Sequence, residues 1–180
     1  MRLSNKRIAI FVEEGFEDLE FWVTVMRLRE EGARVTVVGV KANHTVKSKN
    51  GGLTATSQVA ADLVRADDFD AVVVPGGWAP DKLRRYPSVT GLVRRAYEQG
   101  KIIGLICHAG LVGISAGIVK GHKATGSLGI KDDLVNAGAT WVDEPAFREG
   151  HLVWGRIVAD LPDFCRELVA ALRQVAADSG

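Results

Sequence analysis

Short apolar runs and longer amphipathic stretches alternate along most of the chain. The runs are rich in Val and Ile and too short for helices, a pattern that is typical of buried strands. They predict strands at 7–12, 34–40, 70–74, 102–106, 139–142 and 151–158. The stretches between them predict helices at 17–31, from about 80, and at 88–99, 109–115, 131–136 and 162–177. Alternating strands and helices indicate a doubly wound, three-layer α/β/α sandwich with a mainly parallel sheet.

The first predicted helix, 17–31, carries a stripe of apolar residues at helical spacing. They are Leu19, Trp22, Val23 and Met26. We expect this stripe to face the core, and Arg27 and Arg29 to face water. Glu17 suits a surface carboxylate at the positive end of the helix dipole, and Gly32 predicts where the helix stops.

The segment 41–58 breaks the alternation, because it is polar and favours strand over helix. Its Asn50-Gly51 dipeptide is typical of a tight turn. We therefore expect a small hairpin that leaves the main sheet. No internal repeat, linker or low-complexity segment divides the rest of the chain.

Composition limits the class of protein. A chain of 180 residues is typical of one domain, here 1–180, with a substantial core. The 23 basic and 22 acidic residues are mixed, so no basic block predicts binding to nucleic acid. No apolar run approaches the length of a membrane span, and we expect no signal peptide before the first strand. Two cysteines in distant segments do not suggest a disulfide framework, so we expect a reducing, cytoplasmic setting.

The clearest candidate for chemistry is Cys107, which directly follows the predicted strand 102–106. His108 comes next, and the small residues of 109–115 predict a helix packed beneath. A strand that breaks into a helix at a cysteine resembles a nucleophile elbow. The N–H groups and dipole of that helix favour a thiolate, which a reactive cysteine needs. The alternative is a small hydrophobic side chain at the end of a core strand.

Glu20 is the most informative acid in the sequence. It lies one turn inside the first predicted helix, beside apolar positions, where a carboxylate is costly unless it has a partner. We expect it to face Cys107 and, if partly desolvated, to hold its proton and share it with the sulfur. The alternative is an ordinary carboxylate on the surface of the helix.

The turn Pro75-Gly76-Gly77 ends a strand at the sheet edge where doubly wound folds bind ligands. The N–H of Gly76 or Gly77, together with that of His108, could form an oxyanion hole for a carbon attacked by Cys107. His108 is a candidate acid or base, with a solvent-facing histidine as the alternative. Its ring need not lie beside the sulfur. Trp78 could line the pocket, although tryptophans more often pack.

We expect the remaining histidines and cysteine to have structural or surface roles. His44, His122 and His151 have no acid or cysteine at metal-ligand spacing, so we expect no metal. Cys165 lies on or near the apolar side of the last helix and indicates a core residue. A dinucleotide site is excluded because Glu13-Glu14 would repel a pyrophosphate. A phosphorelay receiver is excluded because the strand 70–74 does not end in an acceptor aspartate.

With these residues in place, the sequence resembles the PfpI-type branch of the superfamily that includes the parkinsonism-associated deglycase. The resemblance covers nearly the whole chain. The motifs that carry it are 15–20 (GFEDLE), 75–77 with Pro80-Asp81, 106–108, 136–138 with 143–145, and 160–162 with Phe164-Cys165. It implies a flavodoxin-like fold, similar to class I glutamine amidotransferases, and a site without a cofactor.

The resemblance also implies roles for individual residues. Cys107 would be the nucleophile, Glu20 its carboxyl partner and His108 the adjacent histidine, with an oxyanion site at Gly77 and His108. In the hexameric members an acid just after the Gly-Gly turn reaches the histidine of a neighbouring subunit, and Asp81 holds that place. We therefore expect self-association as a homodimer or hexamer. The alternative is that Asp81 caps the short helix that begins nearby.

Three departures from the family pattern predict a reshaped pocket wall. The usual Gly and Pro after Cys-His are Ala109 and Gly110 here, and Leu105 replaces a common small residue. The usual Thr-Ser-Arg-x-Pro stretch is 154–158, where only Arg156 matches. Family members are described as peptidases, glyoxalases, deglycases and stress-response or redox-sensing proteins. We expect a cysteine-dependent stress-response enzyme acting on small dicarbonyls, their adducts or peptides. The alternative is a protective redox sensor without efficient turnover.

Overall fold

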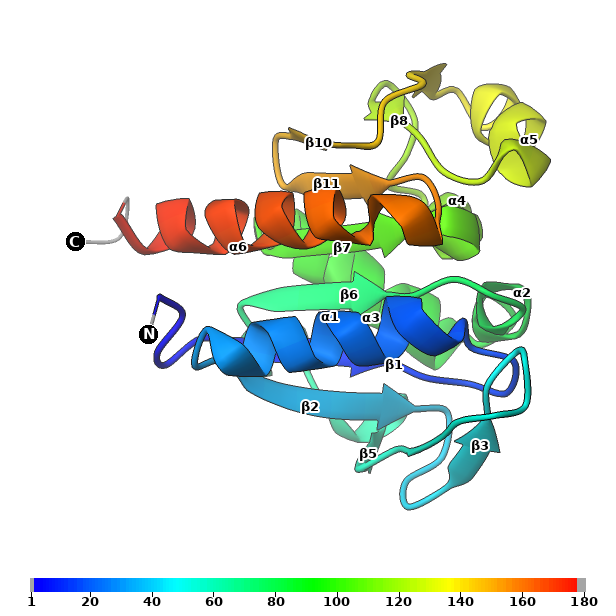
Figure 1. Ribbon diagram of the computed structural model, residues 1–180. Coiled ribbons are helices and arrows are strands. Elements are labelled where there is room, and N and C mark those ends of the chain that lie inside the picture. Colours follow the sequence, from blue (N-terminus) through cyan, green and yellow to red (C-terminus); the bar gives the residue numbers. More distant parts are fainter. Residues whose placement is uncertain (1, 178–180) are drawn as a thin grey trace.

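A computed structural model describes residues 2–177, which fold around one central sheet (Figure 1). Seven strands form this sheet in the order β10-β11-β7-β6-β1-β2-β5. Their bounds are β1 Arg7–Phe11, β2 Arg34–Gly39, β5 Val59–Ala60, β6 Ala71–Val74, β7 Ile102–Ile106, β10 Ala146–Glu149 and β11 Leu152–Gly155. All neighbouring strands are parallel except the edge pair β10–β11. The expectation of a mainly parallel sheet is therefore confirmed.

Helices cover both faces of the sheet and complete three layers (Figure 1). α1 (Asp18–Glu30) and α6 (Leu161–Ala177) pack together on one face, whereas α3 (Pro87–Glu98) and α4 (Gly110–Ala116) pack on the other. α2 (Ala79–Leu83) contacts α4, and α5 (Lys131–Asn136) lies beyond α4. The central strands β6 and β7 are buried along their whole length because helices cover them on both sides. This burial explains their unbroken apolar runs.

Two pairs of short strands lie outside the main sheet. β3 (Thr45–Lys47) and β4 (Thr54–Thr56) form the hairpin expected within 41–58, with Gly51 at φ 76° in its turn. β8 (Lys123–Ala124) pairs with β9 (Thr140–Trp141). The strand expected at 139–142 is thus only two residues long and does not join the central sheet. The pattern also missed β10, because its residues are all half-buried and show no alternation.

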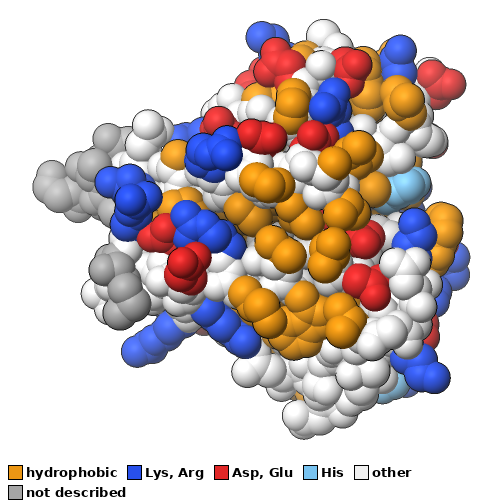
Figure 2. All heavy atoms as spheres, in the orientation of Figure 1, with side chains coloured by type: hydrophobic (Ala, Val, Ile, Leu, Met, Phe, Trp, Pro, Cys, Tyr) orange, Lys and Arg blue, Asp and Glu red, His pale blue; other side chains and the backbone are white. Residues whose placement is uncertain are grey.

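The structure corrects the inward face predicted for α1. Its buried apolar residues are Phe21, Val25 and Leu28. Leu19, Val23 and Met26 are instead 47%, 39% and 62% exposed, and only Trp22 of the predicted stripe is half-buried. The helix carries two apolar stripes, and the sheet covers the one that also includes Glu20 and Thr24. Figure 2 shows hydrophobic side chains gathered over α1 and α6 on this face of the molecule.

The inward face of α1 matters for chemistry because it buries Glu20 completely, at 0% exposure. Glu17 is buried too, which contradicts its assignment as a surface carboxylate. Its side chain accepts hydrogen bonds from the N–H groups of Leu19 and Glu20, so it is the N-cap of α1. The stop at Gly32 is confirmed by its φ of 92°. No helix among residues 2–177 is long and apolar enough to cross a bilayer.

Candidate active site

Cys107 occupies a strained turn at the carboxyl end of β7. Its φ is 61°, in the left-handed region that residues with a Cβ seldom adopt. The strand stops at Ile106, and the chain passes through a 3₁₀ turn at 107–109 into α4. Holding a non-glycine residue in this conformation costs about 1–3 kcal/mol, which the packing around β7 and α4 must offset. The expected nucleophile elbow is therefore present, with the cysteine half-buried rather than sealed in the core.

The ring of His108 lies beside the sulfur, although neighbours in sequence need not meet. Its Nδ1 atom is 3.3 Å from Cys107 Sγ, within hydrogen-bond distance for sulfur. Burial, and next the charge of Lys49, lower the pKa of His108. The imidazole is thus neutral at neutral pH and can exchange a proton with the thiol or with a bound substrate.

Glu20 meets Cys107 at the Gly76 turn, as the sequence predicted. Glu20 Oε1 accepts a hydrogen bond of 2.8 Å from the N–H of Gly76, and Oε2 has no hydrogen-bond partner in the structure. A Cβ at Gly76 would overlap both Glu20 Oε1 and Cys107 Cβ, so only glycine leaves room for the two side chains to converge. Burial, and next the carboxylate of Glu17, raise the pKa of Glu20 to about 7.

The structure does not support the expectation that local backbone groups leave Cys107 as a stable thiolate. The N–H groups of His108 and Gly77 do favour the thiolate. Burial, and next the charge of Glu20, act against them and raise the pKa of Cys107 to about 12. Both acids of the pair therefore hold protons more tightly than usual. A thiolate can therefore form at Cys107 when its proton passes to the carboxylate of Glu20, so that the two groups share one proton.

Only one of the two glycines proposed for the oxyanion hole is available. The N–H of Gly76 is engaged by Glu20, which contradicts its assignment to that hole. The N–H groups of Gly77 and His108 both interact with the sulfur of Cys107, so they converge beside it, on the side where the oxygen of an attacked carbonyl could accept from them. Gly77 has a φ of 81°, and a Cβ there would collide with the backbone of 15–17. This turn requires glycine.

Trp78 and Lys49 form one side of the mouth of the site. Trp78 is 56% exposed, and its ring centre lies 6.2 Å from that of His108. The ammonium of Lys49 lies 4.8 Å from the centre of the Trp78 ring. Trp78 therefore lies near the imidazole of His108, and its role in a pocket wall stays a prediction. Lys49 was not predicted, because a lysine in a hairpin turn has no sequence signal that separates it from other surface lysines.

Asp81 does not join Cys107 and His108 within the chain. It lies in α2 and forms an exposed ion pair with Arg85, at 2.5 Å. In the part of the chain that the structure describes, no carboxylate lies within ion-pair distance of His108. The N-cap of α2 is Trp78, so the alternative assignment of Asp81 as a helix cap is wrong. A contact across an interface stays a prediction.

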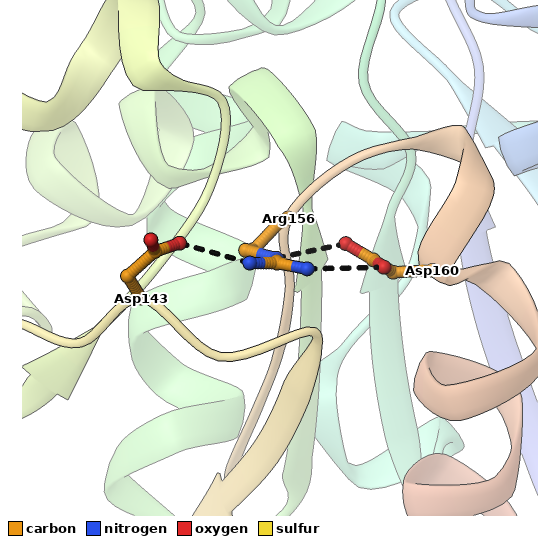
Figure 3. Close-up of polar contacts among 3 residues, drawn as sticks. All are labelled: Asp143, Arg156 and Asp160. Atoms are coloured by element: carbon orange, nitrogen blue, oxygen red, sulfur yellow. Dashed lines mark hydrogen bonds and ion pairs between the residues drawn. The ribbon is translucent and has the colours of Figure 1, made fainter.

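The segment 154–158 departs from the family pattern but retains its arginine, Arg156, which contacts two carboxylates (Figure 3). Arg156 lies between Asp143 and Asp160, at 2.9 Å from each. These contacts raise the pKa of Arg156, led by the hydrogen bond to Asp160. Trp154 is fully buried beside Gly110, and its Nε1 atom has no hydrogen-bond partner in the structure. The arginine therefore joins the loop after β9 to the segment before α6.

A pocket of about 290 Å³ lies beside this ion-pair network. It is lined by Gly126, Leu128, Trp141, Asp143, Arg156 and Ile157. The N–H of Ser127, which lies between the lining residues Gly126 and Leu128, donates to the carbonyl of Cys107 at 3.2 Å. Gly155 pairs with Ile106, so 154–156 lies on the strand beside the one that ends at Cys107, and a reshaped pocket wall stays a prediction.

The other candidate groups lie away from this site. Cys165 is buried, with its sulfur 3.9 Å from Thr24 Oγ1, as expected of a core residue. His122 Nε2 hydrogen-bonds with Tyr97 Oη at 2.7 Å. His44 and His151 are exposed. Among residues 2–177, no group of three His, Cys, Asp or Glu side chains is arranged to hold a metal ion.

Known proteins resemble this chain in both sequence and fold. A deglycase of Pyrococcus abyssi is 36% identical over 93% of this chain and 99% of its own. General stress protein 18 of Bacillus subtilis is 35% identical over 94% and 99%. Protein/nucleic acid deglycase 2 of Escherichia coli is 36% identical over 93% and 98%.

Two solved structures extend the comparison. DJ-1beta of Drosophila melanogaster superposes with a TM-score of 0.85 at 26% identity, covering 96% of each chain. A two-domain protein of Anabaena variabilis, with DJ-1/ThiJ/PfpI-like and ferritin-like domains, superposes with a TM-score of 0.92 at 38% identity. That match covers 93% of this chain and 48% of the other, so this chain spans about half of the two-domain protein. The model of the DJ-1/PfpI family matches residues 6–171, and the chain belongs to this family.

Proposed function

We propose that this chain is a cysteine-dependent stress-response enzyme that converts small dicarbonyls, or their adducts on proteins, to 2-hydroxy acids without a cofactor. The observation that carries the proposal is the arrangement around Cys107 Sγ. A histidine Nδ1 lies 3.3 Å away, and the buried carboxyl of Glu20 has a pKa of about 7. The relatives of P. abyssi and E. coli are named deglycases, and the one of B. subtilis a general stress protein.

The first step that we propose is addition of the sulfur to the aldehyde carbon. The thiol proton moves to Glu20, which is ionised for part of the time because its pKa is about 7. The new C–S bond forms as the carbonyl π electrons move to oxygen. The N–H groups of Gly77 and His108 would stabilise that oxyanion, and protonation gives a hemithioacetal.

The second step is a proton shift between neighbouring carbons. Neutral His108 removes the proton from the carbon that carries sulfur, giving an enediolate, and returns it to the adjacent carbon, while the hydroxyl proton passes from the oxygen of the first carbon to that of the second. The product is a thioester of a 2-hydroxy acid. Water then cleaves the C–S bond, releasing the acid and restoring the thiol. One carbon is oxidised and its neighbour is reduced, so no external oxidant or reductant is consumed.

Peptide hydrolysis has weaker support. A Cys-His nucleophile usually needs a third group to orient the imidazole, and Asp81 is paired with Arg85 in this chain. This activity would therefore depend on Asp81 of another copy.

Assembly of copies through α1 is part of our proposal, since Leu19, Val23 and Met26 expose a continuous apolar stripe. Light scattering of the wild type and of Val23→Glu tests it, and a wild-type monomer would contradict it.

One observation favours redox sensing as a second candidate. Glu20 Oε2 is buried without a hydrogen-bond partner among the described residues, and the carboxyl of Glu20 acts on the thiol of Cys107. When protonated, it could donate to an oxygen atom added to Cys107, which would stabilise a sulfinate. In this case Cys107 would be oxidised by peroxide while turnover stays negligible.

The test is lactate formation from methylglyoxal by the purified chain, followed by NMR. We expect the wild type and Cys165→Ala to form lactate and Cys107→Ala to lose at least about a hundredfold in rate, as expected when a nucleophile is removed. Cys165→Ala is the matched control, because it removes the other thiol. Equal rates in Cys107→Ala and the wild type would contradict the proposal. A wild type that forms no lactate but accumulates a sulfinic acid at Cys107 would favour the redox sensor.

A further inference from the structure

The hairpin turn that carries Lys49 is held against the active-site loops. The N–H of Lys49 donates to the carbonyl of Phe16 at 2.7 Å. Phe16 also forms isolated bridges with Ser48 on one side and Gly77 on the other. The N–H of Asn50 donates to Asp18 at the start of α1, at 3.2 Å. These contacts place Lys49 at the rim of the site, although it is far from Cys107 in sequence.

The ammonium of Lys49 lies over an aromatic face. It lies 4.8 Å from the centre of the Trp78 ring, and the centre of that ring lies 6.2 Å from that of the His108 imidazole, at a tilt of 57°. Among the residues with described positions, no carboxylate lies within ion-pair distance of this ammonium. A cation–π contact orients the group without neutralising it, and leaves N–H donors for a further partner.

The charges around Lys49 show what such a cation can do. Glu17, Asp18 and Glu20 bring three carboxyl groups to the N-terminal turn of α1, and the charge of Glu20 acts on Cys107. An anionic molecule that approached Cys107 would be repelled by them. Lys49 is charged, exposed and at the rim, where it offsets this repulsion for an incoming anion.

We propose that Lys49, oriented by Trp78, binds a carboxylate of the substrate at the mouth of the Cys107 site. Lys49 is then a specificity-determining residue, and the preferred dicarbonyls carry a negative charge a few atoms from the reacting aldehyde. The substrate class rests on the proposed function, whereas the capture of an anion by Lys49 does not. The two are therefore tested separately.

The first experiment compares alkylation of Cys107 by iodoacetate and iodoacetamide, which are similar in size and differ in charge. Both react with the thiolate, so any effect of a mutation on the pKa of Cys107 cancels in the ratio of their rates. Peptide mass spectrometry separates Cys107 from Cys165. In Lys49→Met the iodoacetate/iodoacetamide ratio should fall by about three- to tenfold, the size expected for one partly screened charge pair.

Two variants serve as controls for that experiment. Lys49→Arg keeps the charge and should keep the ratio within about twofold of the wild type. Lys47→Met removes an exposed lysine from the same hairpin and should leave the ratio unchanged. Raising the salt concentration should lower the ratio in the wild type but not in Lys49→Met. The same ratio in Lys49→Met and the wild type would overturn the proposal.

The second experiment compares turnover of 4-carboxyphenylglyoxal and phenylglyoxal. We expect the wild type to have the higher kcat/KM for the carboxylate, and Lys49→Met to lose that preference. If neither compound is turned over while the alkylation ratio still falls, the proposed function fails and the anion site stands. If both are turned over with the same preference in Lys49→Met, the substrate class assigned to Lys49 is wrong.

Discussion

Glu20 Oε1 accepts a hydrogen bond of 2.8 Å from the backbone N–H of Gly76, although the two residues are 56 positions apart in sequence. This contact joins the first turn of α1 to the loop after β6. It uses the N–H of Gly76 and leaves that of Gly77 directed at Cys107. The carboxyl of Glu20 therefore also fixes the turn that carries Gly76 and Gly77, and the first two predictions depend on it.

Replacing Glu20 by Gln should lower the pKa of Cys107. Burial and then the charge of Glu20 raise that pKa to about 12, and Gln keeps the buried shape while removing the charge. The pH at which iodoacetamide reacts half-maximally with Cys107 should fall by on the order of one unit. Gln can still accept from Gly76, so folding should survive. An unchanged pH profile in a folded variant would show that Glu20 does not act on the thiol.

The same variant should change how stability depends on pH. Glu20 has a pKa of about 7 in the folded chain, above its value of 4.5 in the unfolded chain. Between these values the folded state binds more protons, so its contribution is complete below pH 4.5 and is lost as pH rises towards 7.

Chemical denaturation at pH 4, 5, 6, 7 and 8 (about one-unit steps across this window) measures the effect. Relative to the wild type, Glu20→Gln should gain up to about 3 kcal/mol in unfolding free energy across the series. A pH-independent difference between the two proteins would mean that Glu20 titrates normally.

Mild peroxide should modify Cys107 before Cys165. Burial raises the pKa of both thiols, so this selectivity does not come from a stable thiolate. It comes from access, because Cys107 is half-buried while Cys165 is buried. Mass mapping after graded oxidation checks the order of reaction. Earlier modification of Cys165 would contradict the prediction, and Cys107→Ala provides the background for Cys165.

Asp81→Asn should leave the fold intact and lower turnover if Asp81 acts across an interface. Among the described residues its side chain pairs with Arg85 in an exposed contact, so the free energy of unfolding should change by less than about 0.5 kcal/mol. Arg85→Gln breaks the same pair and serves as the matched control. Light scattering with a turnover assay is the measurement. Full activity in an assembled Asp81→Asn variant would confine Asp81 to a surface pair.

Arg156→Gln should destabilise the chain by about 1–3 kcal/mol, because it leaves the largely buried carboxylate of Asp160 without its strongest partner. Arg166→Gln is the matched control, since its pair with Asp163 is exposed and should contribute less than about 0.5 kcal/mol. Urea unfolding of both variants measures the difference. Equal effects of the two substitutions would mean that the network around Arg156 does not hold the loop after β9.

The order of the main elements and the position of the nucleophile could be predicted from the sequence. The apolar runs at β6 and β7 are buried by helices on both sides, those at β1 and β2 are buried over most or half of their length, and such burial selects apolar residues that the sequence shows directly. The break at Cys107 is also local, because a small-residue helix follows the strand at once. The carboxyl edge of a parallel sheet then brings Glu20, Gly77 and Cys107 together by topology.

The tertiary structure determined which of the two apolar stripes of α1 is buried. α1 carries two apolar stripes, and only the position of the sheet determines that Phe21, Val25 and Leu28 are buried while Leu19, Val23 and Met26 are exposed. Periodicity reports that a helix has an apolar face, but the partner of that face is far away in the chain.

The chemistry of the site was decided in the same way. The state of Cys107 depends on burial and on the charge of Glu20, which compete with nearby N–H groups that the sequence does show. Lys49 and Trp78 meet only because Phe16 bridges both Ser48 and Gly77. Electrostatic forces and burial act through space, so local sequence determined the groups that are present, and folding determined which of them act on one another.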